Sequence, residues 1–324
     1  MRRVLLNNTD LRVSPICMGT ANYGTDIDRE TAKTQINMFV EMGGNFIDTA
    51  HVYGDWVPGV KGRSERIIGD WFKETGRRHD IILSTKGAHP DLSDMSKSRV
   101  NPAEIKKDLD ESLLYLKTDY IDIYFLHRDN PQVPVAEILD TLEDARLKGK
   151  IRYYGCSNWS LPRIEEADRY AREHQLSGFV CNQLMWSLAD INSYNVADKT
   201  LVLMDRETYE YHKRTGKNAM AYTSIAKGYF SKKADGIPVP KKLSAVYDNE
   251  SNENIYRELV NISRELNRSI SEVALAYMMH QEFTTVPIVS FSNQQQLKEG
   301  IRSCDLVLDN DIVERLRRLK RYVY

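Results

Sequence analysis

The feature that most restricts the fold of this 324-residue chain is a regular alternation of short apolar runs with amphipathic helical patterns. The apolar runs are rich in β-branched and aromatic residues, which is typical of buried strands. Strands separated by helices must pair in parallel, because a parallel pair needs a long crossover connection. The predicted strands cover residues 16–19, 45–48, 81–86, 121–127, 151–156, 178–183, 219–222 and 285–289.

Helix start signals stand between these runs. Asn101 precedes a proline and is followed three residues later by Glu104, a pattern that favours a helix N-terminus. Ser269 and Glu272 have the spacing of a capping box. Helical patterns also cover residues 31–42 and 162–175.

About eight such β-α units predict a single domain over residues 1–324, an α/β protein of the (β/α)8 TIM barrel type. Residues 3–6 and 11–14 flank a turn cluster and predict an N-terminal β-hairpin. The rival fold, an open doubly wound sheet, usually carries a glycine-rich G-x-G-x-x-G turn that residues 18–24 lack. Residues 186–199 and 230–254 are expected to be long βα loops on the active-site face.

Composition excludes several classes of protein. A net charge of -1 argues against a nucleic-acid binder, which would carry a basic face. No apolar run reaches the roughly 20 residues of a membrane span, and the N-terminus has no signal-peptide pattern, so a cytoplasmic protein is expected. The four cysteines form no C-x-x-C pair and no zinc-ligand spacing, which predicts buried free thiols and no metal site.

Four polar side chains fall where catalytic residues of a barrel are found. Asp48, Lys86 and His127 end three successive strands, and Tyr53 follows Asp48 closely. Reduction of a carbonyl by hydride leaves an alkoxide that must be protonated, and a phenol holds its proton at neutral pH. An ammonium beside the phenol is expected to lower its pKa. A carboxylate would keep the ammonium charged, and an imidazole would polarise the carbonyl.

The sequence of these segments resembles a known signature. Residues 45–54 (Asn-Phe-Ile-Asp-Thr-Ala-His-Val-Tyr-Gly), followed by Gly-Arg-Ser-Glu at 62–65, resemble the aldo-keto reductase superfamily, in particular its aryl-alcohol dehydrogenase-like and bacterial members. Residues 84–86, 119–127, 148–158 and 182–183 match in the same order. The resemblance covers nearly the whole chain and implies an NAD(P)(H)-dependent enzyme, because the barrel itself supplies no hydride.

The resemblance also implies residue roles. Asp48, Tyr53, Lys86 and His127 match the family's catalytic tetrad, with Tyr53 as proton donor. Gly19 and Thr20 match positions near the nicotinamide ribose, and Asp48 lies close by. Residues implied at the rest of the cofactor are Ser157, Asn158 and Gln183 at the carboxamide, Tyr222 stacked on the ring, Thr223, Ile225, Lys227 and Gly228 along the pyrophosphate, and Ser290, Gln296 and Glu299 after the last strand.

Two departures from the family pattern affect cofactor and substrate. The positions that often carry a Lys or Arg for the 2'-phosphate are Ser290, Ser292 and Gln296 here. NADP(H) is the family's usual cofactor, but NAD(H) stays open because a phosphate without a cationic partner binds less tightly. An insertion at residues 55–61 follows Tyr53 directly and is expected to place Trp56 at the substrate mouth.

The substrate class is left between two alternatives. Arg128, followed by Asp129 and Asn130, is expected to give polar contacts, as for a sugar-like carbonyl. Trp56, Trp159 and Trp186 would instead form an apolar pocket for an aryl aldehyde. The sequence thus predicts an alcohol dehydrogenase or carbonyl reductase acting on a small molecule, with no oligomeric state assigned. The alternatives are a nucleotide-sensing regulatory module of the same fold, like potassium-channel β subunits, and a metal-dependent lyase or hydrolase barrel.

Overall fold

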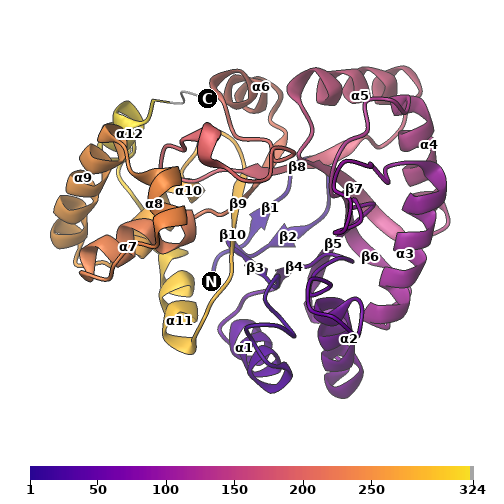
Figure 1. The fold of residues 1–324 in the computed structure, drawn as a ribbon, viewed down its shortest axis with the longest axis horizontal. Helices are drawn as coiled ribbons and strands as arrows, with labels where there is room; N and C mark the ends of the chain where they lie inside the picture. The colour runs from indigo at the N-terminus through magenta and orange to yellow at the C-terminus, as the bar shows by residue number, and fades with distance from the viewer. Residues whose placement is uncertain (322–324) are drawn as a thin grey trace.

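The computed structural model describes residues 1–321 and shows a parallel barrel surrounded by helices (Figure 1). The barrel closes in the order β10-β3-β4-β5-β6-β7-β8-β9, and each neighbouring pair is parallel. The predicted (β/α)8 fold is therefore confirmed. Its strands are β3 (Cys17–Gly19), β4 (Phe46–Asp48), β5 (Ile82–Gly87), β6 (Ile121–Leu126), β7 (Ile151–Ser157), β8 (Phe179–Met185), β9 (Asn218–Tyr222) and β10 (Thr285–Val289).

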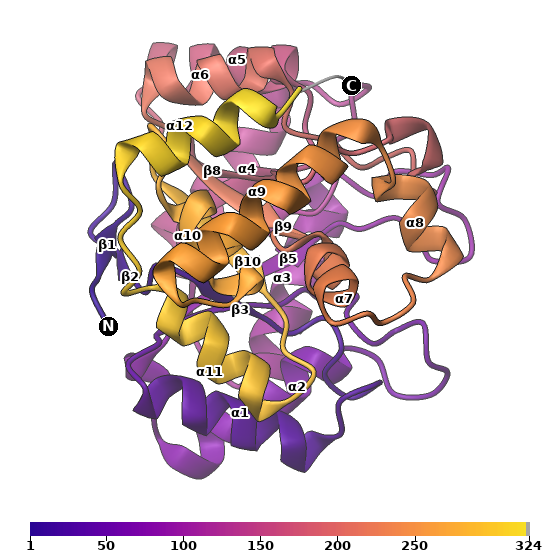
Figure 2. The same cartoon turned by 90° about the vertical axis from the view of Figure 1, so that its left-hand side faces the viewer.

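The helices begin where the sequence carries capping residues. The Asn101 side chain accepts hydrogen bonds from the backbone of Ala103 and Glu104, and both bonds of the Ser269–Glu272 capping box are present. Figure 2 shows α9 across the outside of the barrel with α10 beneath it and α12 alongside. The helices are α1 (Arg29–Glu41), α2 (Arg63–Thr75), α3 (Pro102–Leu116), α4 (Val135–Leu147), α5 (Leu161–Glu173), α6 (Arg206–Thr215), α7 (Tyr229–Ala234), α8 (Lys241–Tyr247), α9 (Glu250–Leu266), α10 (Ile270–Met279), α11 (Gln294–Ser303) and α12 (Asn310–Leu319).

One of the two predictions of a long loop is wrong. Residues 186–199 are irregular apart from one 3₁₀ turn, as predicted. Residues 230–254 instead hold most of α7, all of α8 and the start of α9. Both short helices bury aromatic side chains, and the rings of Tyr229 and Tyr247 lie 5.6 Å apart. Tertiary packing therefore stabilises helices of six and seven residues that are too short to show a periodic pattern.

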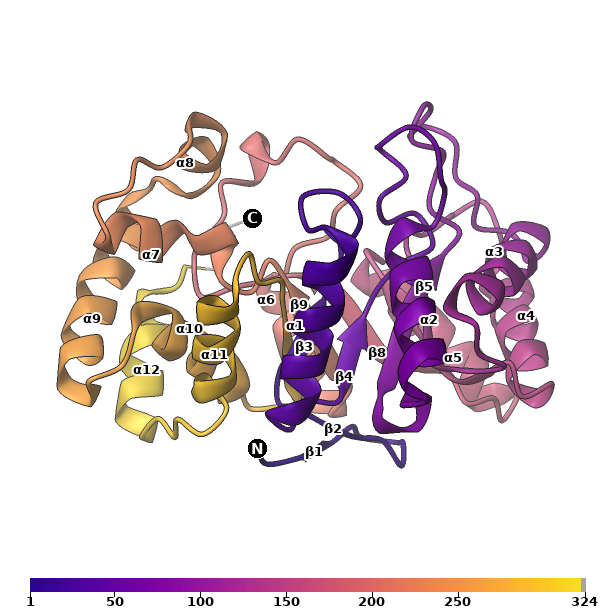
Figure 3. The same cartoon turned by 90° about the horizontal axis from the view of Figure 1, so that it is seen from below.

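The N-terminal hairpin closes one end of the barrel and leaves the other end open. Strands β1 (Val4–Leu5) and β2 (Arg12–Val13) pair antiparallel, as predicted. The Asn7 backbone donates to Asn218 Oδ1 at 2.8 Å, and Asn218 Nδ2 donates back to Asn7 O at 3.0 Å. Figure 3 shows this hairpin below the barrel and the long loops at the opposite end. The open end is therefore the carboxyl end of the strands, where a barrel active site is expected.

Two smaller predictions concern the core and the membrane. All four cysteines are buried free thiols, as predicted. Within residues 1–321, the structure contains no helix with the length and apolar character needed to cross a bilayer.

Candidate active site

The barrel register brings three of the four predicted catalytic side chains to one rim. Asp48 ends β4 and pairs with Ser84 on β5. Lys86 lies two residues further on, so it points to the same side as Ser84. His127 follows β6 directly, and its backbone donates to Gly87 O at 3.0 Å.

Lys86 is the centre of the hydrogen-bond network. Its side chain is almost wholly buried, and Nζ donates to Asp48 Oδ2 at 2.5 Å, Thr49 O at 2.6 Å and Tyr53 Oη at 3.2 Å. Burial disfavours the charge, but the Asp48 carboxylate and the Tyr53 phenol outweigh it and raise the pKa of Lys86. Lys86 is therefore an ammonium with all three donors used.

The Asp48 carboxylate is held on both oxygens. Oδ2 accepts from Lys86, and Oδ1 accepts from Ser84 Oγ at 2.7 Å and Gln183 Nε2 at 3.0 Å. A buried charge needs such partners to remain stable. Asp48 therefore fixes the position of the ammonium on which Tyr53 depends.

Tyr53 lies in the turn after β4, with its backbone donating to Ala50 O at 3.0 Å. The next residue, Gly54, has φ +92°, a left-handed conformation that only glycine adopts without strain. Burial raises the pKa of Tyr53, and the Lys86 ammonium offsets only part of that rise. The ammonium therefore lowers the phenol pKa as expected, but the desolvation of the buried phenol is larger, so the net shift is upward.

His127 is a neutral imidazole in this environment. Burial holds the pKa of His127 well below its usual value, and the neighbouring His89 ring and the Arg128 and Lys86 cations lower it further. Its ring lies 5.8 Å from that of Tyr53 and 4.7 Å from that of His89, whose own pKa burial lowers to about 4. Nδ1 of His127 is buried without a hydrogen-bond partner among the described residues.

A groove of about 980 Å³ runs across the open end of the barrel from Tyr53 and His127 to α11. All the residues that the sequence implies for the cofactor line this groove, so the structure brings them together, while their role in binding stays a prediction. They are Gly19, Thr20, Asp48, Ser157, Asn158, Gln183, Tyr222, Thr223, Ile225, Lys227, Gly228, Ser290, Gln296 and Glu299.

The amide of Asn158 is fully used by protein partners. Its Oδ1 accepts from Tyr222 Oη at 2.6 Å and from the Val202 backbone at 3.0 Å. Its Nδ2 donates to His127 O at 3.3 Å and Ser157 Oγ at 3.1 Å. A ligand amide can therefore bind Asn158 only by exchange, and the contacts to Tyr222 and Ser157 are the ones that come from side chains of groove residues.

The predicted substrate residues separate into three groups. Arg128 lines the groove beside His127. Trp56 is half-exposed, and its ring centroid lies 6.4 Å from that of Tyr53. The prediction that Trp159 and Trp186 form the pocket is wrong, because both are buried and neither lines the groove. The Trp159 ring packs edge-on against that of Phe179.

The prediction that Asp129 and Asn130 contact the substrate is also wrong. The Asp129 carboxylate accepts from Arg163 Nε at 3.1 Å, and Asn130 Nδ2 donates to Val100 O at 3.2 Å. Neither residue lines the groove. Both instead fix the loop that follows β6.

Three contributors to the site escaped the sequence analysis. Ser84 orients Asp48, the Thr49 carbonyl accepts from Lys86, and His89 packs on His127. Ser84 had a usable signal, because it stands two residues before Lys86 on the same strand and must share its face. The Thr49 carbonyl and His89 had none, since a backbone contact and a loop conformation leave no periodic pattern.

One cluster behind Tyr53 has metal-ligand residue types. Atoms of His51, Asp108 and Glu111 lie within 4.8 Å of one another. His51 Nε2 is 2.8 Å from Glu111 Oε2, and Asp108 accepts from Arg99 Nη2 at 2.6 Å and from the Ala88 backbone at 2.8 Å. The guanidinium balances the acidic charge, so we assign this cluster as an ion-pair network.

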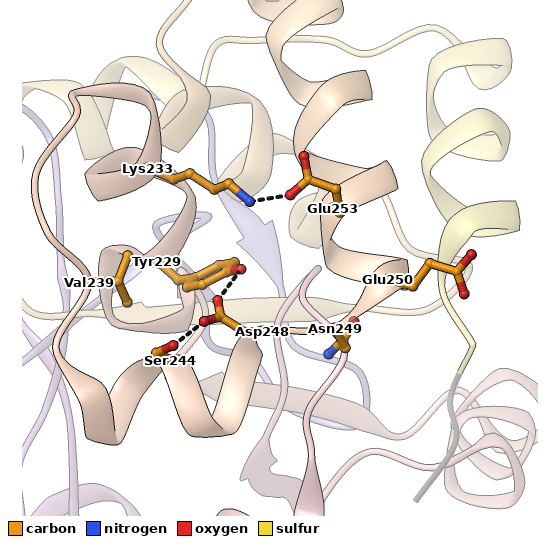
Figure 4. Close-up of a pocket in the computed structure, with 8 residues that line it drawn as sticks. All are labelled: Tyr229, Lys233, Val239, Ser244, Asp248, Asn249, Glu250 and Glu253. Atoms are coloured by element: carbon orange, nitrogen blue, oxygen red, sulfur yellow. Dashed lines mark hydrogen bonds and ion pairs between the residues drawn. The ribbon is translucent and has the colours of Figure 1, made fainter.

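A second cavity of about 560 Å³ lies among α7, α8 and the start of α9 (Figure 4). Tyr229 Oη donates to Asp248 Oδ1 at 2.8 Å, Ser244 also bonds Asp248, and Lys233 pairs with Glu253. These polar groups satisfy one another, and none of the lining residues belongs to the groove. The cavity therefore takes no part in the chemistry described above.

Comparisons with known proteins agree with this geometry. A model described as "Aldo/keto reductase family" matches residues 15–321. The uncharacterized oxidoreductase YrpG of Bacillus subtilis is 28% identical over 98% of this chain and 95% of its own length. Norsolorinic acid reductase of Aspergillus flavus is 26% identical over 97% of this chain and 79% of its own length. The structure of aldo-keto reductase AKR11C1 from Bacillus halodurans in its holo form superposes with a TM-score of 0.75 at 25% identity, covering 100% of this chain and 97% of its own.

Proposed function

The chain belongs to the aldo/keto reductase family, and from that membership we propose that Tyr53 protonates the carbonyl oxygen while Asp48, Lys86 and His127 prepare this step. The family and the related oxidoreductases make the chain an NAD(P)H-dependent reductase. The observation that supports the role of Tyr53 is its hydroxyl 3.2 Å from a buried, triply bonded ammonium at the barrel mouth.

The groove residues fit a nicotinamide dinucleotide. The hydroxyl oxygen of Thr223 is buried without a partner among the described residues, and Thr223 lines the groove, so a polar ligand group is needed there. Lys227 and Gly228 both have positive φ, which turns the chain sharply beside the groove. A dinucleotide bound along these residues supplies the hydride for the reaction.

Each of the four central side chains has a different role in the proposed reaction. Neutral His127 can donate a hydrogen bond that polarises a carbonyl oxygen placed between it and Tyr53. An alkoxide is a far stronger base than a phenolate, so Tyr53 gives up its proton to it even though burial raises the phenol pKa. The Lys86 ammonium stabilises the phenolate that results, and Asp48 holds the ammonium in place.

The test is a Tyr53→Phe variant that keeps the ring and removes the proton. Turnover of an aldehyde is expected to fall by about 10²- to 10⁴-fold, the usual contribution of a positioned general acid. The dissociation constant of the nucleotide, measured by fluorescence titration, is expected to stay at the wild-type value. Retained turnover would refute the role of Tyr53.

We further propose that the enzyme prefers NADH to NADPH. The groove stretch after β10 carries Ser290, Ser292 and Gln296 where the family often has a cation, and it adds the carboxylate of Glu299. Glu299 accepts a hydrogen bond from Gln295 Nε2 at 3.0 Å and forms no ion pair within residues 1–321. A 2'-phosphate beside this carboxylate is repelled, whereas a 2'-hydroxyl can donate to it.

Separate fluorescence titrations decide the cofactor. NADH is expected to bind at least tenfold more tightly than NADPH, and Glu299→Lys is expected to narrow or reverse that ratio. Lys298→Glu on the same helix is the matched charge control, because Lys298 does not line the groove. Equal affinities in the wild-type enzyme would contradict the proposal.

The half-exposed indole of Trp56 supports an aryl carbonyl as the substrate body. The indole lies edge-on to the Tyr53 ring, which lines the groove, although Trp56 itself is outside the groove lining; an aromatic ring bound beside Tyr53 can cover its exposed face. Trp159 and Trp186 are buried, so Trp56 is the one of the three whose ring is exposed beside Tyr53.

A further inference from the structure

Arg128 places a second buried cation in the groove that Tyr53 and His127 also line. It follows His127 in the chain, and its side chain is only 8% exposed. Nε donates to Thr200 Oγ1 at 2.7 Å, Nη1 to His127 O at 2.7 Å and Nη2 to Asp198 Oδ2 at 2.8 Å. A guanidinium has five N–H groups, so these contacts use three of them.

The carboxylate that meets Arg128 is itself at the surface. Asp198 lies on the irregular loop between β8 and α6, and its side chain is 33% exposed. It offers one oxygen to the guanidinium, while its other oxygen accepts from the Thr200 backbone at 2.9 Å and the Thr200 hydroxyl at 2.5 Å. This one-point contact is weaker than the two-point pairing that a free carboxylate can make with arginine.

Lys86 cannot serve the same purpose. Its three donors are taken by Asp48, Thr49 and Tyr53, and any ligand bond would break that set. Unlike Lys86, Arg128 therefore has donors left for a ligand. The charge of Arg128 also acts on the central groups, because it opposes the rise in the pKa of Tyr53 and adds to the lowering of the pKa of His127.

We propose that Arg128 binds a carboxylate of the substrate, with Asp198 occupying that place in the free enzyme. The inference rests on the proposed function and narrows its substrates to carbonyl compounds that carry an acid group a few bonds from the carbonyl. Because Arg128 and His127 are consecutive residues that both line the groove, a substrate that contacts both needs its acid group within a few bonds of the carbonyl. Short oxo-acids and carboxybenzaldehydes satisfy this condition.

The experiment compares matched acids and esters. We would measure kcat/KM for 4-oxobutanoate against its methyl ester, and for each carboxybenzaldehyde isomer against its methyl ester, with saturating nucleotide. In the wild-type enzyme the best acid is expected to exceed its ester by at least tenfold, and Arg128→Gln is expected to bring that ratio to about one. Asp198→Asn is expected to lower KM for the acid several times more than for the ester.

Arg315→Gln provides the control. Arg315 on α12 pairs with Glu258 on α9, outside the groove and away from the loop after β6, so its loss is expected to leave the acid-to-ester ratio unchanged. Benzoate, which cannot react, supplies a binding readout: it is expected to raise the melting temperature of wild type and Asp198→Asn but not of Arg128→Gln.

The outcomes separate two failures. If the wild type reduces acids and esters with equal efficiency, or prefers the esters, the role of Arg128 is overturned while the reductase function stands. If it reduces neither class with either nucleotide, the proposed function itself fails. If Arg128→Gln does not fold, the kcat/KM ratio of acid to ester in the wild type and the KM values of Asp198→Asn still test the role of Arg128.

Discussion

Replacing Lys86 with methionine is the most informative single perturbation of this site. Methionine keeps the length of the side chain and removes the charge and the three donors. Three acceptors then lose their partner: Asp48 Oδ2, Thr49 O and Tyr53 Oη. The variant tests whether the ammonium holds the site together as well as taking part in its chemistry.

The size of the effect follows from burial. Both members of the Lys86–Asp48 pair are at most 2% exposed, and removing one partner of such a pair costs about 3–5 kcal/mol of unfolding free energy. Asp48 keeps its bonds from Ser84 and Gln183, so we expect a loss of about 3 kcal/mol, at the lower end of that range. Turnover is expected to fall by at least about 10²-fold, because the phenolate loses its counter-charge.

Urea unfolding of a double-mutant cycle measures the coupling. The four proteins are wild type, Lys86→Met, Asp48→Asn and the double variant. We expect the double variant to lose about 2 kcal/mol less than the sum of the single losses, because the second substitution removes a charge that the first left unpaired. Additive losses within about 0.5 kcal/mol would refute the reasoning, since they would mean that the two side chains do not stabilise each other.

The pH dependence provides an internal check. The pKa of Lys86 is raised above its ordinary value, so the folded state binds this proton more tightly than the unfolded chain does. Such a base stabilises fully below the unfolded pKa of about 10.4, and the stabilisation is lost only as pH rises through the folded pKa. The difference between wild type and Lys86→Met is therefore expected to stay constant from pH 6 to pH 9.

Three other perturbations have definite outcomes. Burial raises the pKa of Glu65 to about 7. Between pH 4.5 and pH 8 the free energy of unfolding of the wild type, measured with urea at each pH, should therefore fall by up to about 3 kcal/mol relative to that of Glu65→Gln. A difference between the two proteins that does not change with pH would contradict the raised pKa. Gly87→Ala puts a methyl carbon 1.8 Å from Tyr124 Oη. We expect the free energy of unfolding, measured with urea, to fall by about 1–3 kcal/mol, and turnover to fall as well. A variant as stable as the wild type would show that the Tyr124 side chain can move away without cost. Trp56→Ala should raise KM for benzaldehydes about threefold to tenfold and leave glyceraldehyde unaffected; equal effects on both would place the indole outside the substrate path.

The barrel could be predicted because its strands and helices produce periodic patterns of apolar residues in the sequence. Each predicted strand overlaps the observed one, and the largest difference at either end is two residues. The placement of Asp48, Lys86 and His127 followed from the same pattern, because parallel strands in a barrel end at one rim. Once the strand ends are known, the convergence of these side chains needs no further information.

The loops were not predictable for a physical reason. The helices α7 and α8 depend on burying Tyr229 and Tyr247 against distant parts of the chain. Trp159 looked like a pocket residue, but its Nε1 donates to Arg128 O at 3.0 Å from within the core. The contact of Arg128 with Asp198 joins residues 70 positions apart. Such contacts depend on how the loops pack, and local sequence patterns do not encode them.

The distribution of charge over the four central groups argues for the phenol as the acid. Lys86 and His127 are both buried, and burial disfavours the charged form of each. Their pKa values nevertheless move in opposite directions, because Lys86 has the Asp48 carboxylate at 2.5 Å and His127 has cations for neighbours. An imidazole that stays neutral at pH 7 has no extra proton to give, and an ammonium whose pKa is raised releases its proton reluctantly. Among the four groups, Tyr53 combines an available proton with an adjacent cation that stabilises the resulting anion, which supports the proposal that Tyr53 is the proton donor.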